Sequence, residues 1–312
     1  MLYIKIEYMT MKNILKYLTY KFKFIHIYLY FNLLPLKILF DGTIKTEIEF
    51  LQTTYNCIYN KFCCTLYRMT STSISHKKNI IYFTNHRTIA DYFIDSIVVN
   101  NIGTFVARKF AFIAIPGLFI FNLITNMTES FHRKKGKTDI CAFEKILKRI
   151  QDTDRNIIIY PEGTRRHGCD YACDLKKGGI YYSYKNDSPI QFVITYGKDD
   201  ILNEKKMRAM PNLSAFVYYS KVYDQDHEKY KSMEEWYEYV NSEWKTFFNM
   251  IYTKEHKIED AYEKIDPSIV HDDDGKRRPI NKTILYIART AVISISLFCV
   301  SKLDKLIGST LF

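Results

Sequence analysis

The sequence contains none of the compact signatures that bind metals or nucleotides. It has no cluster of His and Cys at zinc spacing, no Gly-Lys-Thr phosphate loop and no dinucleotide fingerprint. The seven cysteines are an odd number, and Cys169 and Cys173 supply only two of the four ligands that a structural zinc needs. We therefore interpret the cysteines as reduced thiols and expect neither a metal nor a bound cofactor.

Long uninterrupted apolar runs are also missing from the N-terminal part. Residues 24–40 are interrupted by His26, Asn32, Pro35 and Lys37, so they fall short of the roughly 20 apolar residues of a spanning helix. No apolar run followed by small residues marks a cleaved signal peptide. Residues 1–40 carry six lysines and one glutamate among many aromatic side chains. This pattern predicts that a helical segment, 1–76, lies in the membrane interface.

Acidic side chains are outnumbered by basic ones, 34 against 45, which gives a formal net charge of +11. Such an excess favours an anionic partner, which could be a lipid surface, a phosphorylated substrate or nucleic acid. The basic residues are scattered and accompany no recognised nucleic-acid motif, so we expect no nucleic-acid partner.

The length of 312 residues and the apolar fraction of 47% predict one large α/β domain with appended segments. From about residue 77, strand-like and helix-like patterns alternate, which predicts a mostly parallel central sheet flanked by helices. We place this domain at 77–255 and a polar linker at 256–282. Residues 283–312 form an apolar C-terminal segment that we interpret as a membrane-associated helix. Its length allows a membrane span, in which Arg289 would have to snorkel or pair. Within the domain, the wholly apolar stretch 111–121 predicts burial, with contact to acyl chains as the alternative.

His86 follows the apolar run 79–83, which reads as a buried strand, and it therefore lies where α/β sheets place their ligands. Histidine has a pKa near neutrality and can take a proton from an attacking alcohol. Asp91 lies about 140° from His86 around an ideal helix, so the two can meet only if His86 lies in a turn before the helix. We predict that they do meet, with Asp91 orienting the imidazole. The alternative is that Asn85 or Thr88 caps a helix and His86 is incidental.

A second polar motif, Glu162-Gly163-Thr164-Arg165, follows the strand-like run 156–160. Glycine allows close backbone approach, and arginine offers a planar fork for phosphate. We predict that these four residues contribute to substrate binding. Arg133 is a further candidate phosphate ligand, although it could equally belong to a solvated basic run, and residues 176–179 could add helix N-terminal amides.

Together these blocks resemble the glycerolipid acyltransferase family that contains the 1-acylglycerol-3-phosphate acyltransferases. Asn85-His86 through Asp91 resembles its first block, and Pro161 through Arg165 resembles its third. Phe131-His132-Arg133 and Ser188-Pro189-Ile190 resemble the second and fourth, while Arg108 falls where the family tends to carry a basic residue. The resemblance covers about residues 77–225. His132, and Gly117 directly after Pro116, depart from the family pattern and bear on the identity of the acceptor headgroup.

The resemblance implies a membrane-bound enzyme that transfers a fatty acyl group from acyl-CoA, a co-substrate, to the free hydroxyl of 1-acylglycerol-3-phosphate (lysophosphatidic acid), forming phosphatidic acid. His86 would be the base and Asp91 its orienter, at a bilayer of the endoplasmic reticulum. The motifs do not separate this acceptor from another lysophospholipid, such as lysophosphatidylinositol or lysocardiolipin. An inactive membrane-binding scaffold of the same fold is a further alternative.

Overall fold

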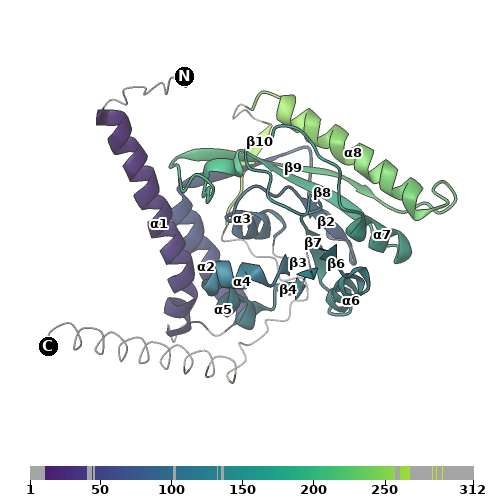
Figure 1. Ribbon diagram of the computed structural model, residues 1–312, viewed down its shortest axis with the longest axis horizontal. Coiled ribbons are helices and arrows are strands. Elements are labelled where there is room, and N and C mark those ends of the chain that lie inside the picture. Colours follow the sequence, from purple (N-terminus) through teal and green to yellow (C-terminus); the bar gives the residue numbers. More distant parts are fainter. Residues whose placement is uncertain are drawn as a thin grey trace, which may run out of the picture.

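The computed structural model describes residues 11–40, 44, 46–100, 103–131, 133–134, 137–256 and 261–267, together with three isolated positions, Thr283, Tyr286 and Thr290. A twisted central sheet separates two groups of helices (Figure 1). The predicted C-terminal helix at 283–312 lies outside the described residues, apart from those three positions.

The main sheet has eight strands in the order β10-β1-β9-β8-β2-β7-β3-β4. Their bounds are β1 Cys64–Met69, β2 Ile81–Thr84, β3 Gly103–Arg108, β4 Thr128–Phe131, β7 Asn156–Ile159, β8 Ile190–Tyr196, β9 Leu213–Tyr223 and β10 Tyr262–Lys264. Two further short strands, β5 Arg133–Lys134 and β6 Lys137–Thr138, form a separate antiparallel pair.

The sheet is mixed, which corrects in part the expectation of a mostly parallel sheet. Five of its neighbouring pairs are parallel, including β2 with both β7 and β8, but β8–β9 and β1–β10 are antiparallel. The connection from β8 to β9 contains only a short 3-10 turn, η1 Lys198–Asp200. Parallel neighbours are usually joined by a crossover that contains an α-helix, and this connection contains none.

The sheet also extends beyond the predicted domain limits of 77 and 255. Strand β1 comes from the segment expected to be membrane-associated, and β10 comes from the expected linker and pairs with β1 at the edge. Strand β10 has only three residues, all of them at least partly exposed, so it carries no alternating apolar pattern that could have identified it.

Alternate side chains of the central strands point to opposite faces of the sheet and enter two separate cores. Ile81 and Phe83 pack with α6 Ile140–Gln151, α7 Lys177–Lys185 and α8 Met233–Thr253. Tyr82 lies in the other core, to which helices of the opposite face contribute. Those helices are α1 Met11–Phe40, α2 Glu47–Phe62, α3 Asp91–Val98, α4 Phe110–Ala114 and α5 Pro116–Thr125.

Helix α1 has two apolar faces. One packs on the core and contains Phe24, Ile27, Phe31, Leu34 and Ile38, at steps of three and four residues. The outer face leaves exposed Leu18, Phe22, Ile25, Leu29 and Leu33, at similar steps. Within the described part of the chain, no helix combines the length and the apolar character needed to cross a membrane.

Helix α1 is attached closely to α5. The side-chain oxygen of Asn32 accepts a hydrogen bond from the backbone N–H of Gly117 at 2.9 Å. A Cβ atom at position 117 would lie 2.7 Å from Asn32 Cα, so the glycine allows this close approach.

The apolar stretch 111–121 is only partly buried. Leu118 and Phe121 are in the core, while Ile113 and Phe119 are exposed, so burial alone was too simple an expectation.

Candidate active site

His86 lies in the turn between β2 and α3, and Asp91 is the first residue of α3. The imidazole Nδ1 is 2.9 Å from Asp91 Oδ2. The same carboxylate oxygen accepts hydrogen bonds from the backbone N–H groups of Arg87 and of Thr88, the latter at 3.0 Å. The N-cap of α3 is Ala90, which makes no side-chain cap. The predicted His–Asp pair is therefore formed, and the alternative that Asn85 or Thr88 merely caps this helix is wrong.

The turn that carries His86 is bonded to its neighbours on both sides. Asn85 exchanges two hydrogen bonds with the backbone of Thr195 in β8, at 3.0 and 3.1 Å. The backbone N–H of His86 donates to Glu162 Oε2 at 2.8 Å, and its carbonyl accepts from Arg166 N at 2.7 Å. The two sequence motifs thus form one unit, because β2 and β7 are parallel neighbours whose carboxyl ends lie side by side.

Arg87 is a buried residue that the sequence analysis did not single out. Its guanidinium donates to Asp199 at 3.1 Å, to the carbonyl of Arg166 at 2.8 Å and to the carbonyl of Cys169 at 2.7 Å. It also lies over the ring of Tyr252, 5.0 Å from the centroid. Because these partners come from three separate segments, Arg87 holds the loop 166–169 against the catalytic turn. An arginine next to a motif histidine reads as a surface residue in the sequence, so nothing local signals this role.

The predicted substrate-binding residues at 162–165 have different environments. Glu162 is buried and uses its carboxylate on the backbone of His86, while Gly163 and Thr164 line the cavity described below. Gly163 adopts φ of 71°, and its carbonyl accepts from Arg108 at 2.9 Å. Whether these residues bind substrate stays a prediction. The side chain of Arg133 lies outside the described side chains.

Arg165 lines the cavity and is paired with the carboxylate of Glu204. Glu204 also accepts the backbone N–H of Ile89 at 3.1 Å, and His167 Nε2 lies 3.4 Å from it. Two hydrogen-bond donors and an imidazole nitrogen therefore surround one carboxylate, and such groups could also surround the oxygens of a phosphate.

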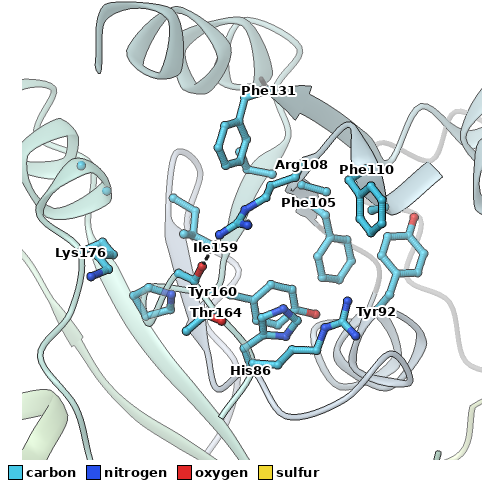
Figure 2. A pocket seen from close by; sticks show the side chains of 18 of the residues that line it. His86, Tyr92, Phe105, Arg108, Phe110, Phe131, Ile159, Tyr160, Thr164 and Lys176 are labelled. Carbon is cyan, nitrogen blue, oxygen red and sulfur yellow. Dashed lines mark hydrogen bonds between the residues drawn. The ribbon is translucent and has the colours of Figure 1, made fainter. Parts of the chain in front are cut away.

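A cavity of about 890 Å³ opens beside His86 (Figure 2). Much of its wall is apolar and is formed by residues of β3, α4, α5 and α6, among them Phe105, Phe110, Leu118, Ile140 and Phe143. Its basic side chains are Arg108, Arg165, Lys176 and Lys177, with His167 beside them. Lys176 and Lys177 lie at the start of α7, as predicted. Among the described residues, none of the lining side chains is acidic.

The ring of Tyr160 stacks on His86, with centroids 4.0 Å apart and an interplanar angle of 15°. Burial lowers the pKa of His86 below its usual 6.5, and the bond to Asp91 opposes this shift. Burial would raise the pKa of Asp91, but the nearby Lys198 ammonium and His86 outweigh it and hold the pKa below its usual value. Burial also raises the pKa of Glu162 to about 7.

The site can accept a proton from a bound hydroxyl group. Asp91 is the acceptor partner of Nδ1, so Nε2 is the nitrogen that remains for a substrate. A base with a lowered pKa is unprotonated at neutral pH and is ready to act. In the described part of the chain no group of three or more His, Cys, Asp or Glu residues could hold a metal ion.

The comparisons with known proteins agree with this geometry. A family model described as Acyltransferase matches residues 67–232, more than half of the chain. The chain therefore belongs to the glycerolipid acyltransferase family, as its motifs predicted.

The fold is similar to the crystal structure of PlsC, the 1-acyl-sn-glycerophosphate (LPA) acyltransferase from Thermotoga maritima. The TM-score is 0.59 at 18% sequence identity, over 78% of this chain and 99% of that chain. A search of the curated proteins gave no significant match.

Proposed function

We propose that this acyltransferase moves a fatty acyl group from acyl-CoA to the free hydroxyl of 1-acylglycerol-3-phosphate at a membrane surface. The observation that carries the proposal is the position of the His86–Asp91 pair in a cavity that combines an apolar wall with several cations. An acyl chain requires the first of these features and a phosphate the second. A thioester and an alcohol can react directly at such a site.

In the proposed reaction, His86 Nε2 takes the proton of the acceptor hydroxyl as its oxygen attacks the thioester carbonyl. The new C–O ester bond forms through a tetrahedral intermediate, the C–S bond then breaks, and the proton passes to the departing thiolate. Asp91 holds the imidazole and stabilises its protonated form. No acyl-enzyme is required.

The acceptor phosphate would bind near Arg165, with Arg108 and Lys176 as further basic residues that line the same cavity. The pairing of Arg165 with Glu204 bears on the headgroup, because a paired arginine has less charge to offer a phosphate than a free one. Remodelling of another lysophospholipid, such as lysophosphatidylinositol or lysocardiolipin, is the second candidate, because these acceptors also carry phosphate and an apolar chain. A panel of acceptors distinguishes them.

The exposed apolar face of α1 supports association with one leaflet of a bilayer. Phe110 and Ile113 of α4 and Phe119 of α5 are exposed as well, and Phe110 also lines the cavity. An apolar surface next to the cavity would let lipid substrates enter without crossing water. The endoplasmic reticulum as the location is part of the proposal and rests on the family resemblance.

The test is acyl transfer by the purified full chain in mixed micelles, with labelled long-chain acyl-CoA and a panel of lysophospholipids. Transfer to lysophosphatidic acid supports the proposal, and transfer only to another headgroup changes it to remodelling. If folded protein transfers to none of them, the scaffold alternative replaces it.

A further inference from the structure

A buried ion cluster lies behind the His86–Asp91 pair. The ammonium of Lys198 lies 2.8 and 3.0 Å from the two carboxylate oxygens of Asp95 and 3.5 Å from Asp91 Oδ1. All three side chains are almost completely buried, with at most 1% of each exposed. Buried charges are costly unless they are paired, so this arrangement needs a reason.

Local structure explains how the three side chains meet. Asp95 lies four residues after Asp91 and therefore on the same face of α3. Lys198 follows the end of β8 after Gly197, whose φ of 85° belongs to the left-handed region. A Cβ atom at 197 would lie 2.8 Å from Ser214 O, so this tight turn requires glycine. The turn directs Lys198 beneath α3.

The charges of the cluster act on His86 through Asp91. With both aspartates ionised, the two carboxylates and one ammonium carry one net negative charge, which favours a proton on the adjacent imidazole. Arg165 and the backbone N–H of Arg87 also act on the pair, and the charges of Glu162 and Asp91 interact. The Tyr160 ring covers one face of His86, and its hydroxyl lies near Asp95. Lys198 is the cation that lies closest to the Asp91 carboxylate oxygen not bonded to His86.

We propose that Lys198 and Asp95 are positioning residues that set the basicity of His86 by controlling how much of the Asp91 charge is available to it. The proposal deepens the proposed function, on which it rests. Asp95 draws the ammonium to itself at 2.8 Å and leaves Asp91 at 3.5 Å. Without Asp95, Lys198 would pair with Asp91 and compete with His86 for it. Without Lys198, two carboxylates would lie together with no cation between them.

The protonation of Asp95 is consistent with such a role. Burial raises the pKa of Asp95 to about 7, although Lys198 opposes this shift. The contacts of both Asp95 oxygens with the Lys198 ammonium, at 2.8 and 3.0 Å, favour the ionised carboxylate. Asp95→Asn tests this charge, because the variant lowers the His86 midpoint only if Asp95 is ionised where His86 titrates.

The experiment compares Asp95→Asn, Lys198→Met and the double variant with the unchanged full chain. The first readout is the pH dependence of kcat/KM for acyl transfer, whose acid limb reports the pKa of the base in the free enzyme. The second readout is the pH dependence of carbethoxylation of His86 by diethyl pyrocarbonate, followed by peptide mass spectrometry. This reagent modifies the unprotonated imidazole and requires no substrate.

We expect the two single variants to shift the His86 midpoint in opposite directions. Asp95→Asn lowers it and Lys198→Met raises it, each by about one pH unit, the scale on which a close charge acts. The double variant, which removes both charges, falls between them. If Lys198→Met does not fold, the double variant serves as the reference. The proposal then expects a lower His86 midpoint in Asp95→Asn than in the double variant.

Midpoints that do not move, or that move in the same direction in both single variants, would overturn the proposal. A purely structural role would lower activity or stability and leave the midpoints in place. If the unchanged chain transfers no acyl group while the labelling midpoints shift as expected, the proposed function fails and the inference about His86 stands.

Discussion

The two ends of the candidate site are built differently. Around His86, the backbone of β8, the side chain of Asp91 in α3 and that of Glu162 in the loop after β7 fix the turn and the contact of His86 Nδ1 with Asp91. Around Arg165, side chains from the 163–167 loop meet Glu204, and all of them are partly exposed. The catalytic end is therefore specified by short-range bonding, whereas the acceptor end depends on side chains that can rearrange. The structure therefore indicates the type of reaction more directly than it indicates the substrate.

The largest expected effect comes from removing the imidazole of His86 at the catalytic end. His86→Ala should lower kcat for acyl transfer by about 10²–10⁴-fold, because it removes the general base. The fold should remain, since the ring is partly exposed and its loss leaves the backbone bonds of residue 86 intact. His227→Ala is the matched control, because His227 is half-exposed and pairs with Asp187 on the surface. Activity retained in His86→Ala would exclude this residue as the base.

Arg87→Met tests whether the buried hydrogen bonds of Arg87 stabilise the catalytic end of the site. The variant leaves Asp199 and two carbonyls without their donor, and we expect a loss of about 3–5 kcal/mol in the free energy of unfolding. Urea denaturation followed by tryptophan fluorescence measures the loss. Arg149→Met, which removes a surface pair between Arg149 of α6 and Glu129 of β4, should change stability by less than about 1 kcal/mol. Equal stability of the two variants would contradict the role of Arg87.

At the acceptor end, Arg165→Ala should raise the KM for the lysophospholipid by about tenfold or more, with a smaller effect on kcat. The reason is the loss of charge-assisted hydrogen bonds to the phosphate, each of which contributes about 1.5–3 kcal/mol. An unchanged KM would remove Arg165 from the phosphate site.

Glu204→Gln tests whether Glu204 competes with the phosphate for Arg165. The variant keeps an acceptor for the N–H of Ile89 but removes the charge that pairs with Arg165. We expect a KM for the acceptor that is lower by about two- to fivefold, on the scale of a partly exposed ion pair. Glu243→Gln, which affects a remote pair with Lys221, is the control. A higher KM in Glu204→Gln would mean that Glu204 orients Arg165 and does not compete with the phosphate.

The last prediction concerns the pH dependence of stability. The pKa of Glu162 is raised by burial to about 7 in the fold, from a usual value of 4.5. Its contribution to stability is therefore complete below pH 4.5 and is lost as the pH rises to about 7. In Glu162→Gln this part of the pH dependence should disappear, while an acceptor for His86 N–H remains. Thermal unfolding between pH 4.5 and 8 measures it, and identical slopes in both proteins would contradict the raised pKa.

Several features of the fold were predictable because they depend on local patterns. The strands that become β2 and β7 are short apolar runs followed by polar motifs, and α6 and α8 show helical periodicity. The partial burial of α4 and α5 was not predictable, since a wholly apolar stretch has no polar face to show which side is covered. The antiparallel pairing of β9 escaped prediction as well, because pairing direction depends on the path of the connection.

What the sequence determined by itself is the chemistry of the catalytic turn. His86 and Asp91 are five residues apart with a turn between them, and so short a segment can bring the two side chains together through its own backbone. Tertiary structure decided everything that depends on distant segments: the Asp95–Lys198 pair, the anchoring of Arg87 and the pairing of Arg165 with Glu204. Each joins residues at least 39 positions apart, and no local pattern encodes a contact that only the packing of the sheet and its helices creates.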